Sequence, residues 1–331
     1  MFSSRAALMS LIIASTCSGQ ALANESVSFA MNSWIGYAPL FVASAKGYFG
    51  DYNIKYIHIE QGINAALLSR DVDMADLSMN QVIMDNIKGS KIKVFMPIDY
   101  SNGADQIISK TSIKNIKDLK GLTIPLDIGS YSELLLAYAL QQNGLSIRDI
   151  KMKDVPASDV PSVLLGNRAK VGVTWAPHTE VILSHPGYKT LYSSREAPGL
   201  ISDSLCANSV WISDHKNASE AIITGFLKGE NYIYKHPKKA FNIVGNYLGI
   251  SPIQARREYN GVINPSVSEM RYMMTGEGKH NHNLIDYKKS INIVTDLMNK
   301  TNVIKSRVYI SPDLLLYQKY VVKEEESIMV L

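Results

Sequence analysis

Cysteine is nearly absent from this sequence: among 331 residues only Cys17 and Cys206 are cysteines. We expect Cys17 to be lost with an export signal, so the mature chain can form no intramolecular disulfide and must rest on its hydrophobic core. Beyond the N-terminus the chain also lacks any run of the roughly 18 apolar residues that a membrane-spanning helix needs. Neither sign of charge dominates, since 34 Lys and Arg stand against 30 Asp and Glu. So small and dispersed an excess excludes a nucleic-acid partner from our expectations.

The first 23 residues have the organisation of a signal peptide. Arg5 precedes the apolar stretch Ala6 to Ala14, and Ala21-Leu22-Ala23 supplies a cleavage site of the small-x-small type. We expect the mature chain to begin near Asn24 and to reside in the periplasm, because export without disulfides fits a bacterial envelope. A lipid anchor on Cys17 is the alternative, but the residues before it lack the usual leucine and small-residue pattern.

Strand-like and helical runs alternate through most of the chain, which predicts an α/β fold with largely parallel sheets. The predicted strands are 27–31, 54–59, 74–77, 122–125, 151–155 and 171–174, and the predicted helices between them are 38–46, 63–69, 132–143 and 159–165. The last third is mainly helical, over 217–234, 237–248, 253–259 and 284–299. Asn217 and Glu220 have the spacing of a capping box for the first of these helices, and Trp211 lies in a strand-like run.

The mature chain is long enough for two lobes, because single cores stop growing near about 250 to 300 residues. There is no low-complexity linker, so we expect the chain to cross between the lobes more than once, near 105–108 and near 199–204. This predicts a discontinuous first lobe, formed by 24–104 and 203–331, and a second lobe formed by 105–202.

Polar stretches follow several of the predicted strands, at the position where open α/β sheets bind ligands. They are "NSWIGYAP" at 32–39, "SMNQ" at 78–81, "DYSNGAD" at 99–105, "DIGSYSE" at 127–133 and "TWAPH" at 174–178, with "SDSL" at 202–205 beside the second crossing. Together they would ring one cleft. The candidate ligand-binding residues in them are Trp34, Tyr37, Asn80, Asp99, Asp105, Ser130, Tyr131, Ser132, Glu133, Trp175 and Asp203.

These candidates favour two kinds of ligand group. Residues 130–132 open a helix, where free backbone N–H groups and the helix dipole attract an anion, although a serine there can equally be a simple cap. The acids Asp99, Asp105, Glu133 and Asp203 favour a cation, because a buried lone carboxylate is costly; the alternative is that they cap turns or lie in solvent. The aromatic residues would be either walls of the cleft or core.

Six stretches resemble one known family. They are "WIGYAPLFVASAKGYF", "ALLSRDVDMADLS", "NGADQIISK", "LKGLTIPLDIGSYSELLLAYALQQNGL", "VGVTWAPH" and "LISDSL". The chain resembles substrate-binding proteins of the nitrate, taurine and aliphatic-sulfonate importers, whose relatives also bind thiamine precursors. The resemblance covers most of residues 27–210. It implies a two-lobed type II periplasmic binding fold with its ligand in the inter-lobe cleft, no enzymatic activity, no cofactor, and delivery of the ligand by a monomer to an ABC permease.

The chain departs from the family pattern at two positions. Glu133 stands where the family commonly has histidine, and Ala176 stands where an acid often follows the tryptophan. The first departure argues against a simple inorganic anion. A molecule carrying both charges, such as a taurine-like amino-sulfonate, reconciles the helix opening with the acids. The rival is a flat nitrogen heterocycle, such as a thiamine-precursor pyrimidine, with a carboxylate on its amino group.

Three other functions stay open to different degrees. Proteins of this shape also present ligands to membrane receptors, and the sequence does not separate such a sensory adaptor from an importer subunit. Pyrimidine synthases share the fold, but they use a cysteine-rich iron site that a chain with one mature cysteine cannot build. His280-Asn281-His282 could in principle share a metal, but no cysteine or nearby carboxylate completes the ligand set, so no metal site is expected.

Overall fold

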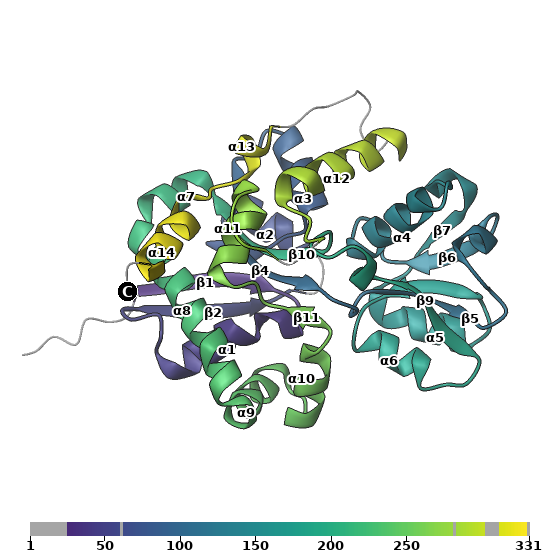
Figure 1. The fold of residues 1–331 in the computed structure, drawn as a ribbon, viewed down its shortest axis with the longest axis horizontal. Helices are drawn as coiled ribbons and strands as arrows, with labels where there is room; N and C mark the ends of the chain where they lie inside the picture. The colour runs from purple at the N-terminus through teal and green to yellow at the C-terminus, as the bar shows by residue number, and fades with distance from the viewer. Residues whose placement is uncertain (1–24, 60–61, 281–282, 302–310, 330–331) are drawn as a thin grey trace, which may run out of the picture.

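The computed structural model describes residues 25–59, 62–280, 283–301 and 311–329, and Figure 1 shows them as two lobes side by side. The predicted signal peptide with Cys17, and Asn281 and His282 of the histidine pair, lie outside the described residues. Within the described ranges, no helix combines the length and the apolar character that crossing a bilayer requires.

The larger lobe is built on a six-stranded sheet with the strand order β11-β4-β10-β3-β1-β2. Its strands are β1 (Glu25–Met31), β2 (Tyr52–His58), β3 (Met74–Asp76), β4 (Ile92–Ser101), β10 (Ser202–Asn208) and β11 (Val262–Ile263). β1 is parallel to β2 and β3, whereas β10 is antiparallel to both β3 and β4. The expectation of largely parallel sheets is therefore wrong. β10 returns from the smaller lobe and enters the middle of the sheet from the opposite end.

Helices cover the sheet of the larger lobe (Figure 1). They are α1 (Ala38–Lys46), α2 (Ile63–Ser69), α3 (Met79–Ile87), α7 (Ser209–Asp214), α8 (Lys216–Lys235), α9 (Pro237–Leu248), α10 (Pro252–Tyr259), α11 (Val267–Thr275), α12 (Tyr287–Thr301), α13 (Pro312–Leu315) and α14 (Lys319–Met329). Two expectations fail here. Trp211 lies in helix α7, and α8 begins one residue before Asn217 with His215 as a cap that makes no side-chain bond, so the predicted capping box does not form.

The smaller lobe holds a three-stranded sheet in the order β8-β5-β9 and a parallel pair, β6 and β7. Its elements are β5 (Gln106–Lys110), β6 (Thr123–Leu126), α4 (Tyr131–Gln142), β7 (Lys151–Asp154), α5 (Val160–Leu165), β8 (Val171–Thr174), α6 (His178–Leu183) and β9 (Tyr188–Ser193). Single 3-10 turns connect several elements, namely η1 (Ile35–Tyr37), η2 (Ile116–Leu119), η3 (Ile147–Asp149), η4 (Ala157–Asp159) and η5 (Ser194–Glu196).

The chain passes between the two sheets twice, from β4 to β5 through residues 102–105 and from β9 to β10 through residues 194–201. We therefore keep 24–104 with 203–331, and 105–202, as our proposed division into lobes. The crossing segments are tied together by hydroxyl groups: Ser101 and Ser194 share a hydrogen bond of 2.7 Å between their Oγ atoms, and Gly103 N donates to Ser194 Oγ at 2.7 Å.

The lobes also touch away from the crossings. Asn80 Nδ2 of α3 donates a 2.6 Å hydrogen bond to Gly129 O, just before α4. Farther out, Arg257 of α10 pairs with Glu180 of α6 at 2.7 Å. Near the start of α4, the Tyr131 hydroxyl donates to Ser202 O at the first residue of β10, so the start of α4 lies beside β10.

Candidate functional site

The turn between β1 and α1 explains the aromatic residues and the glycine at 34–37. Trp34 is 6% exposed, and its indole Nε1 donates a 3.0 Å hydrogen bond to Asp99 Oδ2 on β4. Tyr37 is fully buried, and its hydroxyl donates to Asn32 Oδ1 at 3.2 Å. A Cβ at Gly36 would overlap the Asp99 carboxylate and lie 2.6 Å from Trp34 Nε1. The glycine therefore makes room for a buried acid, which the indole then orients.

Three carboxyl groups meet on the neighbouring strands β3, β10 and β4. Asp203 lies opposite Asp99 in the β10–β4 ladder, and on the other side β10 pairs with β3, which ends at Asp76. Asp76 is held by Ser204 N, which donates to its Oδ1 at 3.0 Å. All three are at least nine-tenths buried. We call Asp76, Asp99 and Asp203 the carboxyl cluster.

Asp76 did not appear among the sequence candidates, although it is central to the cluster. It lies within the predicted strand 74–77, whereas the candidate beside it, Asn80, comes from the polar stretch that follows this strand. A signal was available, because an acid inside a short apolar strand cannot be buried cheaply without a partner or a function. Its counterparts Asp99 and Asp203 were found because each stands in a polar stretch.

Burial raises the pKa of each group in the cluster. Desolvation is the largest cause for Asp99 and Asp203, whose pKa values lie well above the usual range for aspartate, and the charges of the other acids raise the pKa of Asp203 further. Burial also raises the pKa of Asp76 to about 6. Among the described residues, no basic side chain forms an ion pair with the cluster, and Asp99 Oδ1 is buried without a hydrogen-bond partner. The cluster therefore has no cationic partner within the described chain.

Asp105 lies at the first crossing and borders the cluster. It is 3% exposed, burial raises its pKa to about 6, and its charge in turn raises the pKa values of Asp99 and Asp203. Its backbone is fixed on both sides, since Asp105 N donates to Ser101 Oγ at 3.2 Å and Ser194 N donates to Asp105 O at 3.0 Å. The acid thus lies in the first of the two segments that connect the lobes.

Some of the backbone N–H groups at the start of α4 have hydrogen-bond partners within the chain. Ser130 caps the helix by accepting from Ser132 N at 3.1 Å, and Glu133 Oε2 accepts from Gly129 N at 2.8 Å. Ser132 is fully buried, and its Oγ has no partner in the chain. Tyr131 points across to the larger lobe, where its hydroxyl donates to Ser202 O at 2.7 Å. Burial raises the pKa of Tyr131, and the charges of Asp203 and Asp76 add to that rise.

Asn80 and Trp175 lie at the border between the lobes. Besides its bond to Gly129, Asn80 has an Oδ1 that is buried without a partner. Trp175 directly follows β8 of the smaller lobe, is half-buried, and packs against the core cluster of the larger lobe that contains Trp34. The structure thus brings most of the sequence candidates together where the lobes meet. Ser130 and Glu133 form hydrogen bonds with backbone N–H groups at the start of α4.

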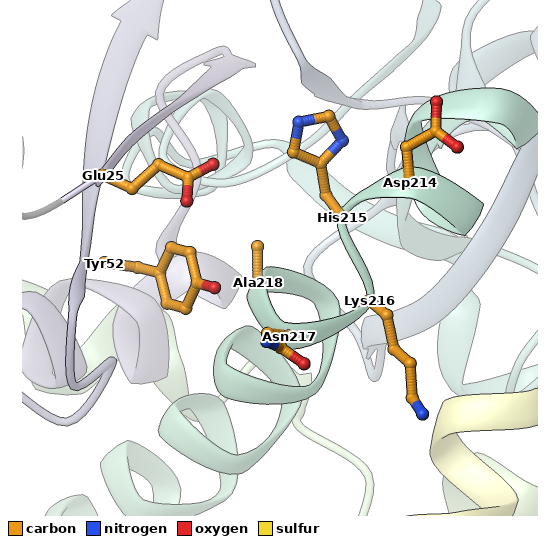
Figure 2. A pocket seen from close by; sticks show the side chains of 7 residues that line it. All are labelled: Glu25, Tyr52, Asp214, His215, Lys216, Asn217 and Ala218. Carbon is orange, nitrogen blue, oxygen red and sulfur yellow. The ribbon is translucent and has the colours of Figure 1, made fainter.

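A separate pocket lies at the opposite end of β1 and β2. Figure 2 shows it between the first residues of these parallel strands, Glu25 and Tyr52, and the segment 214–218 where α7 ends and α8 begins. Its volume is about 400 Å³ and it is open to solvent. None of its lining residues belongs to the carboxyl cluster, which lies on β3, β4 and β10, so this pocket is no part of the site described above.

Comparison with known proteins agrees on the fold. The alkanesulfonate-binding protein SsuA from Xanthomonas axonopodis pv. citri, solved with bound MOPS, superimposes with a TM-score of 0.68 over 88% of this chain and 98% of that one, at 13% identity. The desulfurization enzyme DszB superimposes with a TM-score of 0.62 over 92% of this chain and 99% of that one, at 10% identity. The two-lobed periplasmic binding protein fold is therefore confirmed, and it is a fold that also hosts an enzyme.

Relatives in sequence are distant. A putative thiamine biosynthesis protein of Haemophilus influenzae is 23% identical over 68% of this chain and 74% of its own length. The riboflavin-binding protein RibY of Chloroflexus aurantiacus is 22% identical over 63% of this chain and 62% of its own. The chain spans half the length of the putative binding protein BAB2_1146 of Brucella abortus, at 22% identity.

A family model described as NMT1/THI5 like matches residues 34–240, which is more than half of the chain. The matched range begins at Trp34 and includes every member of the carboxyl cluster. With its fold and this match, the chain belongs to the NMT1/THI5-like family.

Proposed function

We propose that this protein is a periplasmic solute-binding protein that captures a small, amine-bearing organic molecule between its lobes. The single observation that carries the proposal is the carboxyl cluster, in which three buried acids meet without a basic partner among the described residues. Buried charges in proteins are normally paired or coordinate a metal. No three ligating side chains within the described ranges are arranged to hold a metal ion. A cationic or N–H-rich ligand would supply the missing partner.

The geometry supports the amine of the ligand more than an anionic head. Two backbone N–H groups at the start of α4 already have partners. Ser132 N donates to Ser130 Oγ, and Gly129 N donates to Glu133 Oε2. A nitrogen heterocycle bearing an amino group, like the thiamine-precursor pyrimidines, therefore fits better than our first expectation of a taurine-like amino-sulfonate. The amino-sulfonate remains the second candidate, because the unpartnered Oγ of Ser132 could donate to an anionic oxygen.

Delivery to an ABC permease by a monomeric binding protein is the role we propose for the captured ligand. The likeness to SsuA in fold supports a binding protein, and presentation to a membrane receptor stays the alternative. An enzymatic role has less support. The only cysteine among the described residues, Cys206, is fully buried, and burial raises the pKa of its thiol, so it is poorly suited to hold iron or to act as a nucleophile.

A thermal-shift screen with a matched pair of variants tests the proposal. The panel contains 4-amino-5-aminomethyl-2-methylpyrimidine, taurine, ethanesulfonate and nitrate, which separate heterocycle, zwitterion, sulfonate and inorganic anion. A ligand at 100 times its dissociation constant adds about 2.7 kcal/mol of apparent stability. We expect the aminopyrimidine to stabilise the wild type most.

Asp203→Asn should remove most of this stabilisation, because losing one charged partner in a desolvated cleft costs on the order of 2 to 5 kcal/mol. Asp51→Asn removes the same charge from an exposed turn and should bind like the wild type. Stabilisation by nitrate or ethanesulfonate alone, with no response to either amine, would show that the acids do not recognise a positive charge.

A further inference from the structure

The crowding of buried acids in the carboxyl cluster favours a bound proton. Asp203 lies opposite Asp99 on one neighbouring strand, and the backbone N–H of the next residue, Ser204, donates to Asp76 Oδ1 on the other, so three buried carboxyl groups lie close together. Two carboxylates are both acceptors, so a hydrogen bond between them exists only when one carries a proton. Two ionised carboxylates this close would repel each other strongly, as in other pairs of acids that share a site.

The described residues around the cluster offer it hydroxyl groups and further acids, but no base. From η1 and the turn before it, Tyr37 and the Trp34 indole face the cluster; from the first crossing, Asp105; from α4, Tyr131. The remaining titratable neighbours are Tyr287 at the start of α12, which donates or accepts at Ser202 Oγ and Ser204 Oγ, and, at longer range, Tyr259 of α10 and Cys206 of β10. None of these carries a positive charge, so nothing among them compensates three ionised carboxyls.

We propose that the ligand-free carboxyl cluster stores at least one proton at neutral pH, and that a bound cationic ligand displaces it, so that ligand capture is coupled to proton release. The exchange balances in charge: the protonated cluster and the cation give the ionised cluster holding the cation, plus one proton in solvent. The proposal rests on the proposed function for the identity of the cation, but the stored proton is a property of the chain alone.

Two features support this coupling. The pKa of Asp76 is raised to about 6 and those of Asp99 and Asp203 lie well above their usual range, each mainly through burial. Asp99 Oδ1 is fully buried without a partner among the described residues, which leaves one acceptor position that the indole does not fill. Acidification would refill the cluster with protons and release the cation.

The first experiment needs no ligand. Protein labelled with ¹³C at the aspartate Cγ is titrated from pH 4 to pH 9, and Asp76→Asn and Asp203→Asn assign the cluster resonances. We expect at least one cluster carboxyl to be protonated at pH 7. If all three are ionised at pH 7, the proposal is overturned, whatever the protein binds.

A built-in cation provides the matched test of displacement. The charges of Asp203 and Asp76 raise the pKa of Tyr131, and the Tyr131 side chain is only half-buried. Tyr131→Lys therefore places an ammonium group at the cluster, and Tyr131→Met is the uncharged control. In Tyr131→Lys the stored proton should be lost at pH 7, and in Tyr131→Met it should stay. Retention in a folded Tyr131→Lys protein refutes displacement. Should that variant fail to fold, the wild-type titration still decides whether a proton is stored.

Calorimetry then measures the coupling in the wild type with 4-amino-5-aminomethyl-2-methylpyrimidine as the probe, in phosphate and in Tris at the same pH. Release of one proton makes the observed heat differ between the buffers and makes the affinity fall about tenfold per pH unit on the acidic side of the cluster's titration. Binding with equal heats in both buffers would overturn the coupling while leaving the binding function intact. No binding of any amine in the screen, with a stored proton seen by NMR, would instead overturn the proposed function.

Discussion

Gly36→Ala tests whether the turn after β1 is built around the buried carboxylate of Asp99. The added Cβ would overlap that carboxylate and lie 2.6 Å from Trp34 Nε1, and both neighbours are buried. Overpacking a core costs about 1 to 3 kcal/mol. Losing the 3.0 Å hydrogen bond between the Trp34 indole and Asp99 costs about 1.5 to 3 kcal/mol more, because the acceptor is a buried acid. We therefore expect a loss of about 2.5 to 6 kcal/mol in the free energy of unfolding.

Urea unfolding of a double-mutant cycle measures the cause of that loss. In an Asp99→Ala background the carboxylate is gone and the indole has room to move, so Gly36→Ala should cost at least about 1 kcal/mol less than in the wild type. Gly172→Ala is the matched control, since its Cβ would lie 2.6 Å from Leu164 Cδ1 in the smaller lobe, and it should show no coupling to Asp99→Ala. Additive costs for Gly36→Ala and Asp99→Ala, within about 0.5 kcal/mol, would refute the reasoning.

Three further predictions follow from the same geometry. The ligand-free protein should melt at a higher temperature at pH 5 than at pH 7.5. Burial raises the folded-state pKa of Asp76 to about 6, so the stability that the protonated acid contributes is fully present below about pH 4 and is lost as the pH rises through 6. Asp76→Asn should weaken this dependence of the melting temperature on pH. Trp34→Phe keeps an aromatic ring but leaves Asp99 without its N–H donor, so it should lower the free energy of unfolding by about 2 kcal/mol; an unchanged value would mean that the bond contributes nothing. Arg257→Ala should change it by less than about 1 kcal/mol, like Glu180→Ala, because their ion pair is 63% and 34% exposed and screened by solvent; a larger loss would mean that the outer contact holds the lobes together.

Periodicity along the chain was sufficient to predict most of the local structure. The helices predicted at 38–46, 63–69 and 237–248 coincide with α1, α2 and α9, and the strand predicted at 171–174 coincides with β8. These elements carry their own signals, such as Pro39 at the start of α1 and Gly47, with a φ of +67°, at its end. Where local signals compete, the prediction failed: Trp211 suits a strand by composition, but Asn208 accepts from Val210 N and starts a helix instead.

The resemblance to a known family likewise predicted the two-lobed fold. The stretches that carry this resemblance lie at strand ends and before α4. The candidates Asp99 and Asp203 came instead from the polar stretches 99–105 and 202–205. The motifs could not predict which strands pair with one another. β10 enters antiparallel between β3 and β4 after a long excursion through the smaller lobe, and that order alone places Asp203 between Asp76 and Asp99.

The sequence by itself therefore determined many of the helices and strands, and that the chain has the residues for a two-lobed binding fold, but it did not show that Asp99 and Asp203 lie inside strands β4 and β10. Only the tertiary structure decided which acids share a site, since residues 76, 99 and 203 become neighbours through strand pairing and not through any spacing along the chain. It also decided that Ser130 and Glu133 serve the start of α4. Burial then raises the pKa of each clustered acid, and burial is a property that a residue acquires only from its neighbours in space.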